Sequence, residues 1–282
     1  MNPSSSGASR ALTNRDLNTG RVESYYDQIA SLYDARYVNA FFQIYDAVTF
    51  RHLDEILKHV SLDTPMLDVG CGTGHIALFL ASRGYQNITA VDISDSMLSQ
   101  LEANSITQGV RDCLTIERAD FHDMAQYTDG QFGAVICQGS VLDCSVDHPR
   151  AISEMRRVLK TSGFMNLSVH NRQGCGELIA DIGEPGDLEE AFGTGKWYWY
   201  EDGKRIHDFY LFTEEDLSEL AEKSDMDVYS IVGKVVLSRT FVEAVPMDSD
   251  QYREVRDHCM RLASHEALRR TAQYTDVTFR AR

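Results

Sequence analysis

The sequence of 282 residues lacks the segments that would place a protein in a membrane or send it across one. Its longest apolar stretches are short, as at residues 76–81, whereas a membrane-spanning helix needs about 20 apolar residues. The first 20 residues contain neither the apolar core nor the cleavage site of a secretory signal. We therefore expect no membrane contact, and we interpret residues 1–21 as a disordered leader.

Paired cysteines are also missing. The six cysteines form no C-x-x-C pair and have no H-x₃₋₅-H partner, so we expect no metal site. Scattered cysteines in a chain of this length are typical of free thiols in a reducing compartment. The sequence therefore favours a cytoplasmic location.

Positive charge is scarce. The chain has 27 Lys and Arg residues against 43 Asp and Glu residues, and its formal net charge is −16. A surface this acidic repels phosphate backbones, which disfavours nucleic acid as a partner without excluding a local basic patch.

The middle of the chain alternates short apolar runs with helical patterns. Strands are predicted at 66–69, 87–91, 114–117, 132–137 and 164–169, and helices at 75–83, 95–107 and 149–159. This alternation predicts an α/β fold with a doubly wound, mostly parallel sheet.

The pattern changes on both sides of this region. Before it, residues 22–57 are predicted to be helical. After it, we expect loops at 171–192, a β-hairpin formed by 197–200 and 205–212, a helix at 213–223, strands at 228–232 and 235–242, and a helix at 248–270. The hairpin prediction rests on the turn at 201–204, and the first of these helices on Thr213 and Asp216 as an N-terminal capping pair.

A glycine-rich turn, GCGTG at residues 70–74, follows the first predicted strand. Such a turn lets a cofactor approach the backbone, and the next helix offers free N–H groups. A dinucleotide fingerprint would have a third glycine where His75 stands. Asp68, inside the strand, also departs from that fingerprint, so both residues disfavour a dehydrogenase.

The segment LDVGCGTG at residues 67–74 instead resembles motif I of the class I S-adenosylmethionine-dependent methyltransferases. Residues 91–94, with Met97, look like motif II, and residues 119–121 look like the adenine-contacting motif. Residues 159–164 resemble the turn before the fifth strand of that family. The resemblance extends over most of the chain.

This resemblance implies a Rossmann-like, seven-stranded methyltransferase sheet with additions. We expect an N-terminal helical lid at residues 22–60 and the methyltransferase domain at 61–245. A β-hairpin insertion after the fifth strand, within residues 171–212, would cover the substrate. Residues 246–282 are expected to form a C-terminal helical extension.

The implied cofactor is S-adenosyl-L-methionine. The residues that the resemblance assigns to it are Tyr33, Asp68, Gly70, Cys71, Gly72, Gly74, Asp92, Ile93, Met97, Asp120, Phe121 and Gln138. Asp92 would accept hydrogen bonds from the ribose hydroxyls, Asp68 would face the ammonium, and Asp120 would take the adenine amino group. Tyr33, in the lid, would reach the carboxylate. The alternative for the apolar members is core packing, and for Tyr33 it is packing of an amphipathic helix on the sheet.

Two classes of acceptor are excluded by the residues around the end of the fourth predicted strand. Nucleic-acid amine methyltransferases carry an Asp or Asn before Pro-Pro and an aromatic residue, but residues 138–141 are QGSV. Enzymes that methylate cytosine C5 use a Pro-Cys pair, whereas Cys137 follows Ile136.

Candidate substrate residues lie in the lid and in the aromatic run WYWY at 197–200. Tyr25, Trp197 and Trp199 would line the pocket, where ring faces suit an aromatic substrate or a methylated amine. The alternative is a hydrophobic hairpin that shields the sheet. His170, at the end of the fifth strand, is the candidate catalytic base, and its alternative is a structural hydrogen-bonding role.

We therefore expect a methyltransferase that acts on a nitrogen or oxygen of a small molecule by in-line displacement. A tRNA-base or quinone-ring methyltransferase and a non-catalytic S-adenosylmethionine-binding protein are the alternatives. Whether the chain is a monomer or a homodimer is left open by the sequence.

Overall fold

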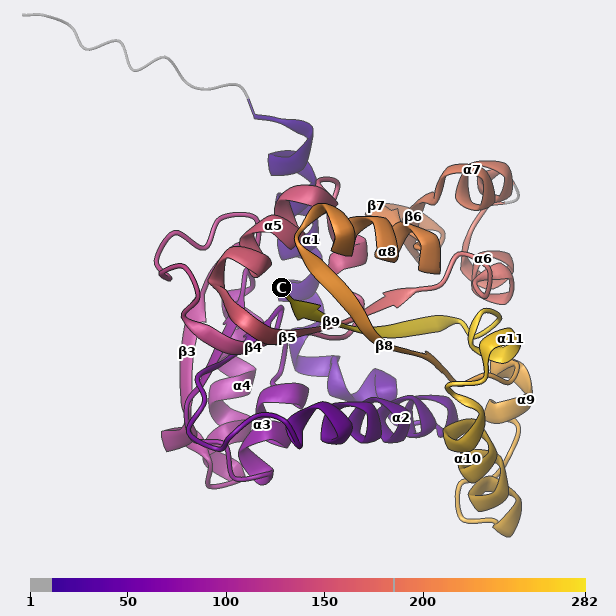
Figure 1. The fold of residues 1–282 in the computed structure, drawn as a ribbon. Helices are drawn as coiled ribbons and strands as arrows, with labels where there is room; N and C mark the ends of the chain where they lie inside the picture. The colour runs from indigo at the N-terminus through magenta and orange to yellow at the C-terminus, as the bar shows by residue number, and fades with distance from the viewer. Residues whose placement is uncertain (1–11, 185) are drawn as a thin grey trace, which may run out of the picture.

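The computed structural model describes residues 12–184 and 186–282. Within these residues seven strands form one sheet in the order β3-β2-β1-β4-β5-β9-β8 (Figure 1). The strands are β1 (Met66–Val69), β2 (Ile88–Asp92), β3 (Leu114–Arg118), β4 (Phe132–Cys137), β5 (Leu159–His170), β8 (Met226–Lys234) and β9 (Tyr274–Ala281). The strand β9 runs in the direction opposite to the other six strands. The predicted Rossmann-like, mostly parallel seven-stranded sheet is therefore confirmed.

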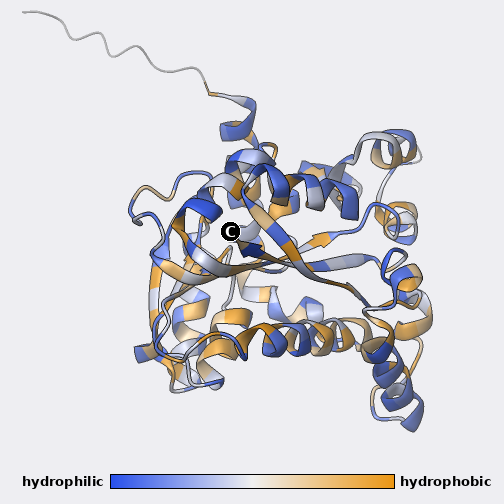
Figure 2. Ribbon diagram, in the orientation of Figure 1, coloured by the Kyte–Doolittle hydropathy of each residue, from blue (hydrophilic) through white to orange (hydrophobic). Residues whose placement is uncertain are grey.

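Helices cover both faces of the sheet. The helices α2 (Ala40–Leu57), α3 (His75–Ser82) and α4 (Asp95–Thr107) lie on one face, and α5 (His148–Val158) and α8 (Glu214–Lys223) lie on the other (Figure 1). Side chains alternate along β1, so Leu67 and Val69 join the core beneath α5 and α8, while Met66 joins the core beneath α2 and α3. Figure 2 shows hydrophilic and hydrophobic residues mixed along these helices, as expected for elements with one buried face.

The N-terminal segment differs from the prediction. The helix α1 (Asn14–Ile29) begins within the expected disordered leader, because Thr13 and Asp16 form a capping box. The rest of that leader, residues 1–11, lies outside the described residues. The predicted single helical segment is also broken by the short 3₁₀ helices η1 (Ala30–Leu32) and η2 (Asp34–Tyr37) before α2 begins.

The insertion after β5 contains two helices where loops were expected. They are α6 (Gly176–Ile182) and α7 (Asp187–Thr194). The predicted hairpin is confirmed as β6 (Lys196–Glu201) and β7 (Lys204–Tyr210), joined at the expected turn. The capping box of Thr213 and Asp216 at α8 is confirmed as well.

The C-terminal part of the chain overturns two predictions. The strand expected at 235–242 is absent from the described structure, and the helix α9 (Arg239–Glu243) occupies part of it. The expected helical extension holds only through α10 (Asp250–Leu262) and α11 (Glu266–Arg269). The chain then returns as β9, which pairs with β5 and β8 inside the sheet. One further short helix, η3 (Arg111–Cys113), precedes β3.

No helix in the described part of the chain is long and apolar enough to cross a membrane.

The position of β9 in the core generates a stability prediction. Phe279 is fully buried in the main core cluster, whereas the next residue, Arg280, is exposed. Replacing Phe279 by Ala should lower the free energy of unfolding by about 3–5 kcal/mol, because it leaves a cavity. Urea denaturation measures this, with Arg280→Ala as the control, which should change stability by less than about 0.5 kcal/mol. Similar small effects in both variants would contradict a core role for the C-terminal strand.

Candidate functional site

The glycine-rich turn between β1 and α3 has three glycines with positive φ, at +64°, +52° and +101° for Gly70, Gly72 and Gly74. Two of them are required by packing. A Cβ on Gly70 would lie 2.5 Å from Val141, and one on Gly74 would collide with Leu101. A Cβ on Gly72 would meet no described atom within 4 Å. Gly72 therefore faces open space that a ligand could fill.

Asp92, at the end of β2, holds this turn in place. Its carboxylate accepts hydrogen bonds from the Gly72 N–H and the Ser94 N–H, each 2.9 Å long. Burial raises the pKa of Asp92, while the bonds from Ser94 and Gly72 oppose that rise. The adjacent Cys71 is buried, and its N–H bonds to the Val91 carbonyl. The turns after β1 and β2 are thus joined through one carboxylate.

Asp68 lies beside this turn, inside β1, with only 1% of its surface exposed. Its Oδ2 has no hydrogen-bond partner among the described residues. Burial raises the pKa of this carboxyl to about 7, an effect that the backbone N–H of Ala77 opposes and the nearby Asp92 carboxylate reinforces. A buried carboxyl oxygen without a partner is costly, so this one marks a place for a hydrogen-bonding or cationic ligand.

An open cleft of about 630 Å³ lies at the end of β2 and β3, lined in part by Ile93, Ala119 and Asp120. The Asp120 carboxylate accepts bonds from the N–H and the Nδ1 of His122, at 2.9 and 2.7 Å. Burial alone would raise the pKa of Asp120, but the bonds from His122 outweigh it and lower the pKa. The half-buried Phe121 stacks on His122 with ring centroids 4.4 Å apart.

Met97 takes no visible part in this cleft. It is 1% exposed and packs within α4, where its N–H bonds to the capping Ser94. The apolar side of the cleft therefore belongs to Ile93, and the packing alternative describes Met97 better.

The N-terminal segment lies directly over these turns. Asp27, in α1, accepts a 2.6 Å bond from the Ser94 hydroxyl, which lowers the pKa of Asp27. Asp34, in η2, accepts a 2.6 Å bond from the Thr73 hydroxyl. Tyr33 sits between them in sequence, its ring 4.8 Å from that of Tyr37, and burial raises its pKa well above the usual value. This segment thus bridges the turns that follow β1 and β2, as a lid would.

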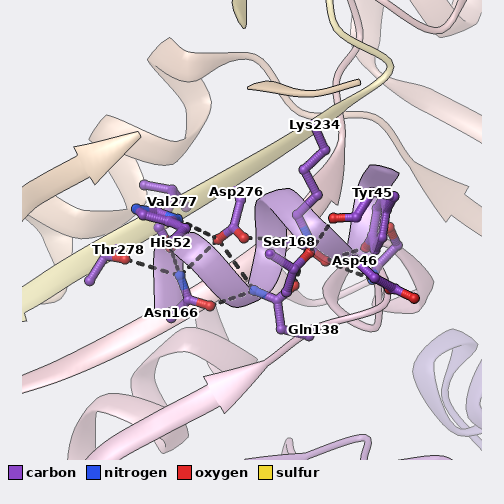
Figure 3. Close-up of polar contacts among 12 residues, drawn as sticks. Tyr45, Asp46, His52, Gln138, Asn166, Ser168, Lys234, Asp276, Val277 and Thr278 are labelled. Atoms are coloured by element: carbon purple, nitrogen blue, oxygen red, sulfur yellow. Dashed lines mark hydrogen bonds and ion pairs between the residues drawn. The ribbon is translucent and has the colours of Figure 1, made fainter. Parts of the chain in front are cut away.

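Gln138, just past β4, is engaged elsewhere. Its Oε1 accepts a 2.6 Å bond from Lys234, and its Nε2 donates to Asn166 and Asp276 (Figure 3). Lys234 and Asp276 are fully buried and form an ion pair at 3.4 Å. His52, in α2, also reaches Asp276, at 3.2 Å. The Gln138 side chain therefore belongs to a buried network, and any cofactor contact at this position is left to its backbone.

His170 ends β5 and is 4% exposed. Its backbone N–H and its Nδ1 each lie 2.8 Å from Oδ2 of Asp143, which is held in the 3₁₀ helix η4 (Leu142–Cys144). Burial lowers the pKa of His170 to about 3, and the nearby Arg239 adds to that effect. Nε2 is buried and has no partner in the part of the chain that the structure describes. The imidazole is thus neutral at pH 7.

Aromatic rings surround His170. The ring centroids of Tyr274, Phe209 and Trp199 lie 4.2, 5.1 and 6.5 Å from that of His170. Trp197 is fully buried, 6.0 Å from Phe209, and supports this wall from behind. Trp199 is only partly covered, so the structure favours it over Trp197 as a contact residue.

Tyr25 joins the lid to the hairpin. Its hydroxyl accepts a 3.3 Å bond from Trp199 Nε1 and donates a 2.8 Å bond to Glu201. Arg36 reaches the same hydroxyl at 3.1 Å and pairs with Glu201 at 3.0 Å. Burial raises the pKa of Tyr25 to about 12, so its hydroxyl keeps its proton at neutral pH. Tyr25 is therefore a link between the two covers of the site.

Three residues of this region were not assigned to it from sequence. Tyr274 lies on β9, which no strand prediction included. Lys234 and Asp276 lie on the two C-terminal strands of the sheet, far in sequence from Gln138. Lys234 is the last residue of β8, and Asp276 lies between Thr275 and Val277 in β9, a strand of mixed polarity, so no local pattern marked the buried pair.

The chain is similar to known proteins in sequence and in fold. A family described as a methyltransferase domain matches residues 67–167. A ubiquinone biosynthesis O-methyltransferase from Chromobacterium violaceum is 31% identical over 135 residues, covering 46% of this chain and 55% of that protein. A solved S-adenosylmethionine-dependent methyltransferase from Methanosarcina mazei has a TM-score of 0.59 at 20% identity, covering 80% of this chain and 96% of that one. The [4+2]-cyclase SpnF has a TM-score of 0.55 at 20% identity, covering 82% and 80%.

The sequence matches span 55 to 66% of the length of the relatives named for ubiquinone biosynthesis. The structural likeness, at 20% identity, extends the agreement in fold to most of the chain. The family match includes the glycine-rich turn, Asp68 and Asp92. Residues 67–167 of the chain therefore match a methyltransferase domain, within a fold that is also found in S-adenosylmethionine-dependent methyltransferases.

Proposed function

We propose that this protein is an S-adenosylmethionine-dependent methyltransferase that acts on a nitrogen or oxygen atom of a small molecule. The observation that carries the proposal is Asp68, a buried carboxyl whose Oδ2 finds no partner among residues 12–184 and 186–282. It lies beside a turn whose central Gly72 faces open space. A cationic ligand that passes this turn would satisfy the carboxyl.

The residues present fit S-adenosylmethionine from one end to the other. Asp68 would face its ammonium, the backbone at Gly72 would follow its methionine portion, and Asp92 would accept from its ribose. Asp120 and Ile93, beside the cleft, would hold the adenine. When bound, the cofactor supplies an electrophilic methyl group on a sulfonium sulfur, and displacement leaves a neutral thioether.

The chain itself positions the acceptor and excludes water. The lid is bonded to Ser94 and Thr73 below it and to Glu201 on the hairpin beside it. Closure of these covers would hold the acceptor in line with the methyl group, and this positioning supplies most of the catalysis in such a displacement. His170, with a buried and unprotonated Nε2, would face the acceptor and receive the proton that it loses.

Two alternatives have a specific observation in their favour. Relatives named for ubiquinone biosynthesis favour a quinone precursor as the small molecule. The likeness to a cyclase shows that this fold also serves a protein named for another reaction, which keeps a non-methylating role in view. We place the protein in the cytoplasm, since its six cysteines are unpaired thiols.

The cofactor assignment predicts selective binding. In calorimetric titrations, S-adenosylhomocysteine should bind with a micromolar dissociation constant, and NAD⁺ should show no heat of binding. Release of S-adenosylhomocysteine from S-adenosylmethionine with a phenol, amine or quinol acceptor would then separate an enzyme from a binding protein. Binding of NAD⁺ alone would overturn the proposal.

The open space at Gly72 predicts a loss of binding without a loss of fold. Gly72→Ala should weaken S-adenosylhomocysteine binding at least about tenfold, because its Cβ occupies the ligand's path, a cost of about 1.4 kcal/mol. Gly203→Ala is a matched control, since Gly203 also has positive φ and no described atom within 4 Å of an added Cβ, but lies in the hairpin turn. Both variants should lose about 1–2 kcal/mol of stability from backbone strain. Equal affinity in the two variants would contradict the assignment.

The raised pKa of Asp68 predicts a pH dependence of binding. Because the ammonium of the ligand favours the ionised carboxyl, affinity should fall by up to about tenfold per unit as the pH drops below about 7, and level off above it. The titratable groups that face Asp68 are Asp92, His75 and the thiols of Cys71 and Cys137.

Asp68→Asn is the control for this measurement, because it removes the carboxyl and leaves the other four groups in place. Calorimetry from about pH 5 to pH 8 should show a flat, weak affinity for this variant. The same slope in both proteins would assign the titration to another group, such as His75.

A further inference from the structure

We infer that Asp143 is a positioning residue that fixes the tautomer of His170, so that Nε2 is a hydrogen-bond acceptor for the hydroxyl or amine hydrogen of an aromatic substrate. This inference rests on the proposed function and deepens it. It concerns which atom of His170 the substrate meets and which class of substrate can meet it.

The local backbone explains why Asp143 reaches His170. After β4 the chain passes through two residues with positive φ, Gly139 at +75° and Ser140 at +62°, and then forms η4. This tight reversal returns Asp143 toward the end of the neighbouring strand β5, where it is fully buried. Its Oδ2 accepts the backbone N–H of His170 at 2.8 Å and lies 2.8 Å from Nδ1 of the same residue.

The double contact decides the tautomer. A neutral imidazole carries one proton. Because Oδ2 of Asp143 already accepts the backbone N–H of His170, we assign it as an acceptor toward the ring too, which holds that proton at Nδ1. Nε2 then presents a lone pair. It is buried and unpartnered within the described residues, a costly state for a polar atom that a ligand hydrogen bond would relieve.

The protonation states favour an orienting role over early proton removal. Burial raises the pKa of Asp143 and lowers that of His170, so neither group is driven to ionise by its surroundings. A base whose pKa is about 3 is a weak acceptor of a proton from a ground-state phenol. His170 would instead orient the O–H or N–H and take its proton once the new bond to carbon has formed.

The surroundings of the His170 ring indicate the substrate class. The neighbouring rings are Tyr274 on β9, Phe209 on β7 and Trp199 on β6. Outside this wall lies Arg239, whose charge helps to lower the pKa of His170 and which pairs with Glu243. Flat apolar walls and one acceptor atom fit an aromatic alcohol or amine, whereas a carboxylate would be repelled by the lone pair.

The test is the tautomer itself, read from ¹⁵N shifts of histidine in the labelled full chain, with His170→Gln to assign the signals. Wild type should show His170 protonated at Nδ1 and bare at Nε2. Asp143→Leu, which removes the acceptor, should move the proton to Nε2. Protonation at Nε2 in wild type, or an unchanged tautomer in a folded Asp143→Leu variant, would overturn the inference.

If Asp143→Leu does not fold, the wild-type spectrum still decides the tautomer. Phenol and anisole are a matched pair of probes for the substrate class, because only phenol has a hydroxyl hydrogen to donate. Phenol should shift the Nε2 signal at least twice as far as anisole does, and equal shifts would reject an aromatic alcohol as the partner of Nε2. None of these readouts needs the cofactor, so a failure to bind S-adenosylhomocysteine would reject the proposed function separately.

Discussion

The site depends on one carboxylate, that of Asp92, which joins two turns at the same edge of the sheet. Its bonds to the Gly72 and Ser94 N–H groups set the distance between the start of α3 and the start of α4. The lid is bonded to these same two turns, through Thr73 and Ser94. Parallel strands make this possible, because their carboxyl ends all meet at one edge, where the helices begin.

A second constraint lies deeper, where Lys234 and Asp276 form an ion pair without exposed surface. Both side chains also contact neighbours from other elements: Gln138 after β4, Asn166 on β5 and His52 on α2 (Figure 3). Removing one partner of such a pair leaves a buried charge, which costs about 3–5 kcal/mol. The network therefore ties the C-terminal strands to the end of β4.

The positions of many candidate site residues were predictable because these residues follow strands in short, local motifs. The turn at residues 70–74 and the acids at Asp92 and Asp120 occupy the edge where a sequence of alternating strands and helices must put them. The predictions for Met97, Gln138 and Trp197 depended instead on where a side chain points. Burial turns the first and third into core, and a lysine from β8 engages Gln138.

The sequence by itself determined the strands of the parallel part of the sheet, the glycine-rich turn, the hairpin and the capped helix α8, since each is marked by a pattern among residues near one another in the chain. Only the tertiary structure decided the rest. It inserted β9 between β5 and β8, and it brought Asp143 to His170, across 27 positions of sequence. Both outcomes are pairings between segments that are distant in sequence. Such pairings form only after the chain has closed the loops between them, and no local pattern encodes them.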